Sequence, residues 1–267
     1  MRQMTFEESK KVELDILKEV AAFCDRKGLR YFLAYGTLLG AVRHKGFIPW
    51  DDDVDIFMPR EDYNALIESF NKESEGRYRL IAPFDPIARH SFAKVMDTKT
   101  VKVENRVDYS KGNLGVDLDV FPLDGQPEDE GEYRKWYQEL QRIYEAHSFF
   151  VLQSPKTFKG KVRCYITKLL YRSKENTLKK AEKLHALYPY DKCDMIGSVD
   201  SRYNPIKTRY PKAWFSAAVS GEYEDGSFAL PIEYDKVLTA TYGDYMTPPP
   251  KEKQVPPHTN RSYFLDD

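Results

Sequence analysis

The sequence predicts a mixed α/β (α+β) fold, in which a mixed sheet is flanked by helices and a helical insertion or subdomain is added. Strand-like runs alternate with helical patterns over the first half of the chain, as they do in sheets that helices cover. A long helical stretch follows. The chain has 267 residues, 41% of them hydrophobic, which is enough for a large core and a subdomain. The expected parts are a core at 1–125, a mainly helical, basic subdomain at 126–230 and a C-terminal segment at 231–267 that returns to the core.

Residues 5–27 are expected to form an amphipathic helix. Thr5 and Glu8 have the spacing of a capping box, in which each side chain satisfies a backbone N–H of the other residue. Apolar residues recur at helical spacing after them, and Gly28 suits the left-handed turn that ends many helices. We expect this helix to cover one face of the sheet.

The other elements follow from alternation and from helical spacing. Strands are expected at 30–35, within 51–59, and near 78–82, 92–96, 100–104 and 115–121. Helices are expected at 37–44, 60–70 and 128–152, with a further helical region at 156–188. The C-terminal third is mixed and ends in a Pro-rich tail, TPPPKEKQVPP.

The composition excludes several classes of protein. Lys plus Arg number 41 and Asp plus Glu number 42, so the net charge is −1, and no basic surplus favours nucleic-acid binding. No apolar run is long enough to span a bilayer, and the N-terminus lacks the apolar stretch of a signal peptide. The three cysteines form no C-x-x-C pair, so neither a disulfide framework nor a zinc site is expected. Together these observations predict a cytoplasmic protein.

The balanced net charge hides a basic segment. Residues 156–183 contain ten Lys and Arg against two Glu, a net charge of +8, with apolar residues among them at helical spacing. One interpretation is a helix with a solvated basic face. The other is a surface for anionic lipid head groups or for a polyanionic, lipid-linked glycan, which predicts weak, salt-sensitive contact with the inner face of the cell membrane.

The densest chemical signal is the run Asp51-Asp52-Asp53-Val54-Asp55. On a strand, side chains alternate between the two faces, so Asp51, Asp53 and Asp55 are expected to share one face. Carboxylates this close together repel one another unless a cation lies between them. The run therefore predicts a site for one or two divalent cations, although solvated charges at a sheet edge would give the same pattern.

A second alternating run, Val116-Asp117-Leu118-Asp119-Val120, puts Asp117 and Asp119 on one face of another strand. If the two strands are neighbours, Asp119 joins Asp53 and Asp55 as a third acidic ligand. Three carboxylates, with the open positions taken by phosphate and water, are typical of a magnesium site.

A Gly-Thr pair precedes the first acidic run. Gly36 has no side chain and so lets the backbone approach a ligand. Thr37 offers a hydroxyl at the beginning of a helix, whose N-terminus attracts anions. Such a pair alone is typical of any turn from strand to helix. Followed by a D-x-D strand and a later strand with Asp, it predicts a phosphate site beside the metal site.

This order of motifs resembles the nucleotidyltransferase superfamily, whose core motif hG[GS] is followed by [DE]h[DE]h and by a third carboxylate. Within that superfamily, the stretch from Tyr35 to Tyr63 resembles the LicD family of phosphotransferases, which is related to fukutin. The runs Asp119-Val-Phe-Pro-Leu-Asp124 and Tyr242-Gly-Asp-Tyr-Met-Thr-Pro-Pro-Pro250 resemble the same family. Thr37 stands where the wider superfamily commonly has Ser, which keeps the hydroxyl.

The resemblance implies a magnesium-dependent transferase with a nucleotidyltransferase-like catalytic core. Such enzymes move a phosphorylated alcohol, typically phosphocholine, from a CDP-activated donor to a sugar hydroxyl of a cell-surface glycan precursor, such as teichoic acid or lipopolysaccharide, and release CMP. Fukutin relatives use CDP-ribitol. The implied partners are CDP-choline or a similar CDP-alcohol and a glycan acceptor that can be lipid-linked. The implied cofactor is Mg²⁺, with Mn²⁺ as the alternative.

The resemblance also implies roles for particular residues. Asp53, Asp55 and Asp119 would be catalytic and would hold the metal, and Asp119 would polarise the acceptor hydroxyl. The residues expected to bind the donor phosphates are Gly36, Thr37, Arg43 and Lys94. Choline would need aromatic walls, for which the candidates are Trp50, Tyr63, Trp136, Tyr242 and Tyr245.

Two other functions stay open. A nucleotidyltransferase would use the same carboxylates to transfer a nucleoside monophosphate from an NTP to a small molecule, and it would release pyrophosphate instead of CMP. A non-catalytic module that binds glycan or lipid would have little reason to cluster Asp53, Asp55 and Asp119. The length of the family-like motif favours the phosphotransferase.

Overall fold

The computed structural model describes the chain from residue 1 to residue 267, except for residues 75, 104–111, 153–154, 200–207, 257–259 and 266–267. The strands of the main sheet are β2 (Phe32–Leu33), β3 (Asp55–Pro59), β4 (Tyr78–Ile81), β5 (Ala93–Asp97), β7 (Asp117–Gln126), β8 (Met195–Gly197) and β9 (Arg209–Pro211). Two smaller sheets contain β1 (Arg2–Gln3), β6 (Thr100–Val103) and β12 (Arg261–Phe264), and β10 (Ala218–Tyr223) and β11 (Gly226–Pro231).

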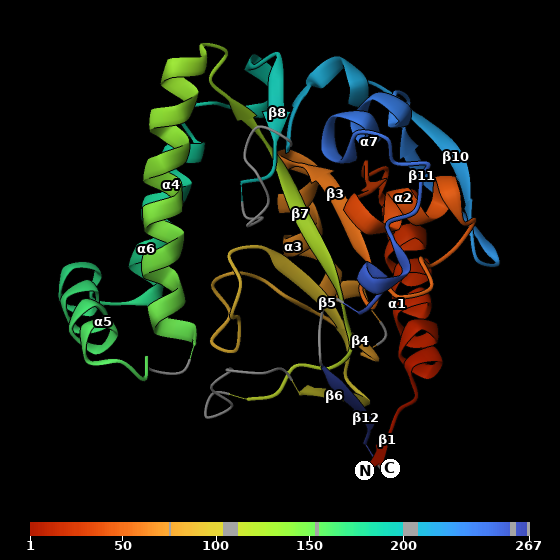
Figure 1. Ribbon diagram of the computed structural model, residues 1–267, viewed down its shortest axis with the longest axis horizontal. Coiled ribbons are helices and arrows are strands. Elements are labelled where there is room, and N and C mark those ends of the chain that lie inside the picture. Colours follow the sequence, from red (N-terminus) through yellow and green to blue (C-terminus); the bar gives the residue numbers. More distant parts are fainter. Residues whose placement is uncertain (75, 104–111, 153–154, 200–207, 257–259, 266–267) are drawn as a thin grey trace.

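The helices are α1 (Phe6–Lys27), α2 (Tyr35–Arg43), α3 (Arg60–Glu73), α4 (Glu130–Val151), α5 (Phe158–Tyr171), α6 (Lys174–His185) and α7 (Tyr234–Tyr242). In Figure 1, α4, α5 and α6 form a group on the left, α1 lies at the right, and α3 lies between them, where it lines a cavity together with α6. Among the residues that the structure describes, no helix is both long enough and apolar enough to cross a bilayer.

Strand β7 is the centre of the main sheet, whose order is β2-β3-β7-β5-β4, with β8 and β9 added at the far end of β7. It pairs in parallel with β3 and antiparallel with β5, and its last residues pair with β8. The sheet is therefore mixed and flanked by helices, which confirms the predicted fold class.

The first helix is built as its sequence predicts. The Thr5 hydroxyl accepts the N–H of Glu8 at 3.2 Å, and the Glu8 carboxylate accepts the N–H of Thr5 at 2.8 Å. Gly28 ends the helix in the left-handed conformation, with φ of 67°. The capping box and the glycine stop are both confirmed.

Several predicted boundaries are wrong, including that of the strand expected at 30–35, which is only Phe32–Leu33. The strand expected within 51–59 begins only at Asp55, and the helix expected from residue 37 already begins at Tyr35. The helical character predicted for 156–188 is confirmed, and it divides into two helices because Arg172 adopts a φ of 68° and Ser173 caps a new helix by accepting the N–H of Asn176. The strand expected at 100–104 ends at Val103, and residue 104 lies outside the described residues.

The helical group has a hydrophobic cluster of its own between α4 and α6, which includes Trp136, Leu140 and Ala181. Among the described residues of the segment 126–230, which was expected to be mainly helical, the last α-helix is α6. The described residues from β8 to β11 form four strands and one short 3-10 helix, and side chains such as Tyr210 and Phe228 belong to the main core. Their burial in that core explains why this stretch is extended.

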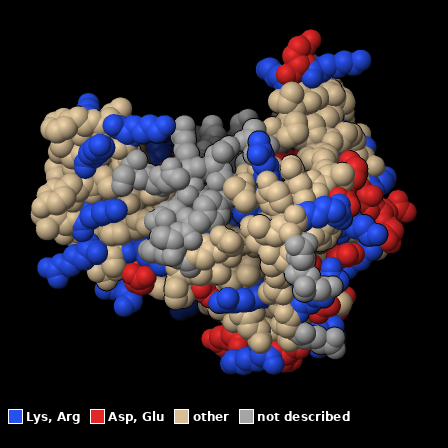
Figure 2. Space-filling model, turned by 90° about the horizontal axis from the view of Figure 1, so that it is seen from below, with Lys and Arg blue, Asp and Glu red and all other residues tan. Residues whose placement is uncertain are grey.

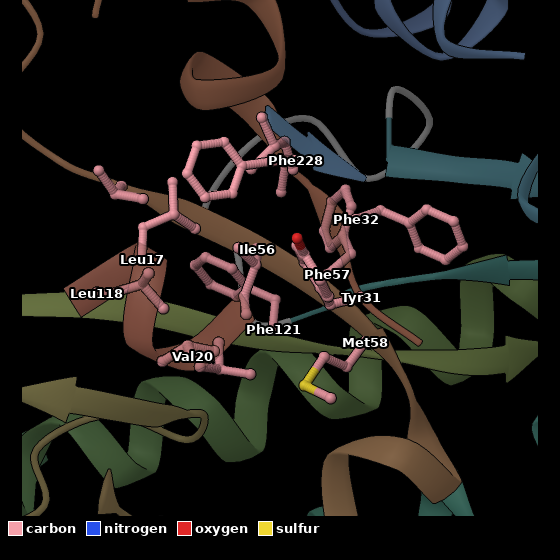
Figure 3. Packing of buried hydrophobic residues seen from close by; sticks show 14 of the residues in the cluster. Leu17, Val20, Tyr31, Phe32, Ile56, Phe57, Met58, Leu118, Phe121 and Phe228 are labelled. Carbon is pink, nitrogen blue, oxygen red and sulfur yellow. The ribbon is translucent and has the colours of Figure 1, made fainter. Parts of the chain in front are cut away.

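The main core covers both faces of β3. All five residues of this strand are buried, so the half-buried alternation predicted for it is wrong. Figure 3 shows Ile56 and Phe57 among side chains that come from α1, such as Leu17, and from the C-terminal third, such as Phe228. Because elements from both ends of the chain pack on β3, most of both faces is shielded from water, and Asp55 at its beginning keeps 8% exposure.

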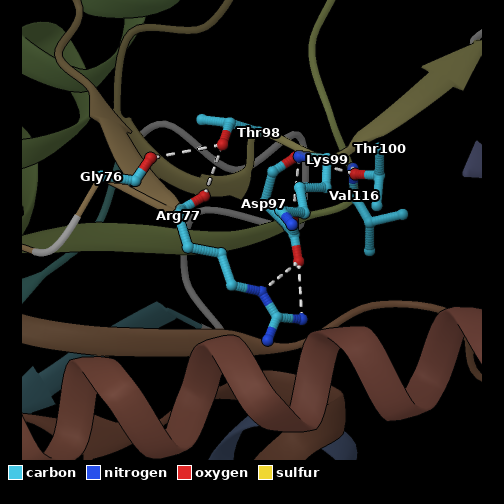
Figure 4. Close-up of polar contacts among 7 residues, drawn as sticks. All are labelled: Gly76, Arg77, Asp97, Thr98, Lys99, Thr100 and Val116. Carbon is cyan, nitrogen blue, oxygen red and sulfur yellow. Dashed lines mark hydrogen bonds and ion pairs between the residues drawn. The ribbon is translucent and has the colours of Figure 1, made fainter. Parts of the chain in front are cut away.

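The turn between β5 and β6 fixes the beginning of β7. The Asp97 carboxylate accepts two hydrogen bonds from Arg77, and the backbone carbonyl of Asp97 accepts the Thr100 hydroxyl at 2.8 Å (Figure 4). The same Thr100 oxygen accepts the N–H of Val116, also at 2.8 Å. This network sets the position of Asp117, the first residue of β7.

Candidate active site

Asp55 and Asp119 face each other across two neighbouring parallel strands. Asp55 on β3 is the register partner of Asp119 on β7. The N–H of Asp119 is bonded to the carbonyl of Val54 at 2.9 Å, which fixes this register directly beside the two carboxylates. The two acidic strands are therefore neighbours, which was the condition for Asp119 to join the acidic residues of the first run.

The carboxylates of this pair stand beside an aromatic floor. Phe57 follows Asp55 on the same face of β3, and Phe121 follows Asp119 on the same face of β7. The ring of Tyr35 lies 4.8 Å from that of Phe57 and 5.4 Å from that of Phe121, measured between centroids. This apolar packing removes water from the inner side of the pair.

Burial and mutual repulsion set the protonation of the pair. Burial, with the charges of Asp53, Asp119 and Asp51, raises the pKa of Asp55 well above its usual value. Burial also raises the pKa of Asp119 to about 6, although the nearby Lys94 opposes this shift. Each of the two groups would therefore gain from a cation placed between them.

Two buried lysines compensate the charge on the neighbouring strand. Lys94 on β5 is the register partner of Asp119, and its Nζ lies 2.5 Å from Asp119 Oδ1 and 3.4 Å from Asp117 Oδ2. Lys102 on β6 lies 2.9 Å from the other Asp117 oxygen. Burial alone would raise the pKa of Asp117, but Lys102 and then Lys94 hold it below its usual range. Lys94 thus lies at the site, as a counter-ion of two carboxylates.

Asp51, Asp52 and Asp53 are gathered by a loop and not by a strand. Because β3 begins only at Asp55, the predicted alternation of faces does not apply to them. One carboxylate oxygen from each of the three lies within 4.8 Å of the others, and all three side chains are half-buried. Asp53 was predicted to be a metal ligand, but Asp51 and Asp52 were not, whereas the structure brings all three carboxylates together.

The Gly-Thr pair positions these acids. A Cβ on Gly36 would lie 2.4 Å from Asp51 Oδ2, so only glycine lets this carboxylate come over the first turn of α2. The Thr37 hydroxyl is buried and accepts the N–H of Asp55 at 2.9 Å, which ties α2 to the start of β3. Both residues were expected to touch phosphate; in this structure they order Asp51 and Asp55.

Arg43 lies away from the acidic cluster. It is at the C-terminal end of α2, about 10 Å along the helix axis from Gly36. Its guanidinium donates to the backbone carbonyl of Tyr245 at 2.6 Å, and so fastens the family-like C-terminal segment to the core.

Of the candidate aromatic walls, Tyr63 and Trp136 are buried in the two cores, whereas Trp50 is half-buried and precedes the acidic loop.

A cavity of about 230 Å³ opens beside the acidic loop. Its lining includes Asp52 and three residues that sequence reasoning missed, namely Lys10, Glu13 and Lys102. Burial is the main cause that raises the pKa of Glu13 well above its usual value. Lys10 and Glu13 are on α1 and line this cavity. The sequence of α1 predicts only an amphipathic helix that covers the sheet, so it contains no motif that would identify these two residues.

The donor chemistry of the cluster fits a divalent cation such as Mg²⁺. Carboxylate oxygens are the hard donors that Mg²⁺ and Mn²⁺ prefer. The acidic loop brings three of them within 4.8 Å, and Asp55 is held beside them at an electrostatic cost that a cation would remove.

Comparison with known proteins places the chain among transferases. The family model described as "LicD/FKTN/FKRP, nucleotidyltransferase domain" matches residues 28–162. The chain is 32% identical over 270 residues to the lipopolysaccharide cholinephosphotransferase LicD of Haemophilus influenzae, and the match covers 99% of this chain and 100% of that protein. It is also 45% identical over 53 residues to the human ribitol 5-phosphate transferase FKRP, which covers 18% of this chain and 11% of FKRP.

Proposed function

This chain belongs to the LicD family of phosphotransferases, and we propose that it transfers phosphocholine from CDP-choline to a sugar hydroxyl of a cell-surface glycan. The match over the whole length of a cholinephosphotransferase supports the transferred group. We take lipopolysaccharide as the first acceptor to test and teichoic acid as the second. The cytoplasmic location stays a prediction.

The observation that carries the proposal is the register pairing of Asp55 with Asp119 beside the acidic loop. In phosphoryl transfer the protein itself forms few covalent bonds. It holds the reacting groups in position and stabilises the charge on the phosphates with charged groups in fixed places. Carboxylates on two paired strands meet this need because the sheet fixes their separation. Mg²⁺ or Mn²⁺ held by Asp53, Asp55 and Asp119 would neutralise the charge of the donor diphosphate.

The reaction balances as a displacement at phosphorus. The acceptor oxygen forms a bond to the phosphorus that carries choline, the bond from this phosphorus to the bridging oxygen breaks, and CMP leaves with that oxygen. The acceptor hydroxyl gives up its proton, for which we propose Asp119 as the receiver.

The remaining residues would support the same step. Lys94 would keep Asp119 oriented, and Thr37 and Gly36 would hold the acidic loop close to β3. Contact of Gly36, Thr37, Arg43 and Lys94 with the donor phosphates stays a prediction. The short match to a ribitol 5-phosphate transferase makes CDP-ribitol the donor to compare with CDP-choline.

The experiment supplies the full chain with Mg²⁺ or Mn²⁺, a lipopolysaccharide or teichoic acid acceptor, and one of CDP-choline, CDP-ribitol, CDP-glycerol and CTP. We expect CMP to appear with CDP-choline and phosphocholine to appear on the acceptor. The Asp55→Asn variant serves as the inactive control. Pyrophosphate released from CTP would instead identify a nucleotidyltransferase, and glycan binding without any product would identify a binding module.

A further inference from the structure

Helix α5 exposes an apolar stripe that no part of the described chain covers. Phe158 is 84% exposed, Tyr165 is 72% exposed, and Leu169 and Leu170 are both 68% exposed. Val162 and Ile166 belong to the same stripe and are also exposed. Exposed apolar side chains are normal when they are scattered, but a continuous row of them marks a binding surface.

The stripe points away from the protein. At 100° per residue, the six apolar side chains fall within about 140° of the helix circumference, and the centre of this arc lies about 170° from Cys164. Cys164 is the one residue of α5 that is buried, on the side where the helix packs against α4. The helix therefore turns one face to the protein and the opposite, apolar face to the outside.

Basic side chains border the stripe on both sides. Lys161 and Lys168 lie beyond one edge of the stripe, Lys159 lies just inside the other edge, and Arg163 lies beyond that edge, where it pairs with Glu145 of α4 at 2.6 Å; the helix itself contains no acidic residue. Figure 2 shows Lys and Arg scattered over uncharged surface at the end of the molecule where α5 lies. A row of apolar residues between two basic rims is the pattern of a helix that lies in the interface of an anionic membrane.

Helix α6 does not share this role, although the basic segment of the sequence runs through it. The Nζ of Lys174 is buried and donates to the carbonyls of Asp85 and Ala88, at 2.7 and 3.1 Å. Leu178 and Ala181 face the helical core and the main body. Lys179, Lys180 and Lys183 of α6 are exposed, but no large apolar side chain of α6 is exposed, so within 156–183 only α5 combines exposed basic and exposed apolar residues.

We propose that α5 docks this protein on the surface of a membrane that contains anionic lipids, with Phe158, Leu169 and Leu170 among the acyl chains and the lysines at the phosphates. A second copy of the chain is a poorer occupant, because two basic rims would face each other across the contact. The helix is about 21 Å long and lies at one end of the molecule, so it can enter a membrane interface without other elements. The proposal does not depend on the function proposed above.

The test is co-sedimentation of the full chain with two kinds of vesicle, made of phosphatidylcholine alone or of equimolar phosphatidylcholine and phosphatidylglycerol. We expect binding to the anionic vesicles, weakened by salt, and little binding to the neutral ones. Leu169→Ser should lower the partition coefficient about tenfold, because it removes apolar burial and leaves the charge unchanged. The double variant Lys159→Glu/Lys161→Glu should lower it at least as much.

Matched variants elsewhere on the surface serve as controls. Val255→Ser removes an apolar side chain that is 59% exposed outside α5, and Lys251→Glu/Lys253→Glu reverses two exposed charges. Both should bind vesicles like the parent chain. Equal binding by Leu169→Ser and the parent would overturn the proposal, and so would a dimer in sedimentation velocity that this substitution dissociates. Transfer to a delipidated, soluble acceptor should be unaffected by Leu169→Ser, so a failure of docking and a failure of the transferase assignment can be told apart.

Discussion

Asp55 and Asp119 are register partners on two neighbouring parallel strands, and burial raises the pKa of both carboxyl groups. We expect Asp55→Asn to reduce transfer by on the order of a thousandfold, because it removes a charge that the diphosphate site needs. In EDTA, the same variant should be at least as stable as the parent, since a buried carboxylate with a raised pKa destabilises the folded state at neutral pH.

Activity measured with Mg²⁺ and urea denaturation measured in EDTA check these two expectations. Asp225→Asn changes an exposed acid in the turn between β10 and β11, and should leave transfer unchanged. Near-normal transfer by Asp55→Asn, or a clear loss of stability in EDTA, would contradict the assignment.

The close approach of Asp51 to Gly36 predicts a loss of metal affinity in Gly36→Ala. The new Cβ would take the place of the Asp51 carboxylate, so Mn²⁺ affinity should fall about tenfold or more. Asp51→Ala should have a similar effect, and the double variant should bind no more weakly than either single one, because both changes displace the same group. Electron paramagnetic resonance of free Mn²⁺ measures the affinity. Gly28→Ala is the control, since its Cβ would meet no atom within 4 Å and only the backbone would be strained.

The contacts of Lys94 with Asp117 and Asp119 predict a structural effect of Lys94→Met. Removing one member of a buried ion group leaves uncompensated charge, so the free energy of unfolding should fall by about 3–5 kcal/mol. Adding Asp119→Asn should restore part of it. The exposed Lys72, changed in the same way, is the control for urea denaturation. If Lys94→Met keeps its stability and only weakens donor binding, Lys94 is a phosphate ligand and not a counter-ion.

The helical group is joined to the sheet through Asp124. Its carboxylate accepts two hydrogen bonds from Arg60, at 2.6 and 2.5 Å, and lies 3.1 Å from the Nδ1 of His185 at the end of α6. We expect Asp124→Asn to lower the free energy of unfolding by about 3 kcal/mol and to speed amide exchange in α6. Glu130→Gln breaks the exposed pair with Arg134, and should produce no measurable change. Unchanged exchange in α6 would show that this contact does not hold the helices.

His147 predicts a dependence of stability on pH. Burial, with the charge of Lys174, lowers its pKa from 6.5 to about 4, and its Nδ1 is 2.9 Å from the Thr177 hydroxyl of α6. Because the folded pKa is depressed, the unfolded chain binds a proton more readily, and stability is lost as the pH falls from 6.5 towards 4. Between pH 7 and pH 5 the loss due to this residue should be about 2 kcal/mol. Urea denaturation of the parent and of His147→Gln at both pH values measures it, and identical pH slopes would contradict it.

The elements that the sequence predicted well are those whose signal is local. The cap of α1 needs only Thr5, Glu8 and Gly28, whose side chains act within one or two turns of the same helix. The acidic runs also predicted where carboxylates gather, because side chains that are close together along the chain are also close in space. The strand boundaries near Asp55 were wrong because the loop before it and the core around it are decided by distant segments.

The sequence by itself determined the fold class, the acidic residues of the candidate site and the family-like motifs, because alternation, capping and charge spacing are properties of neighbouring residues. Only the tertiary structure decided the register of Asp55 with Asp119. Only the tertiary structure also decided which side chains contact these two residues. Strand β6 shows the reason: Lys102 is turned inward while Val103 is 40% exposed, the reverse of what their polarity predicts. The buried Asp117 needs a positive charge nearby. Lys102, which lies fifteen residues earlier in the chain, supplies this charge and is therefore turned inward.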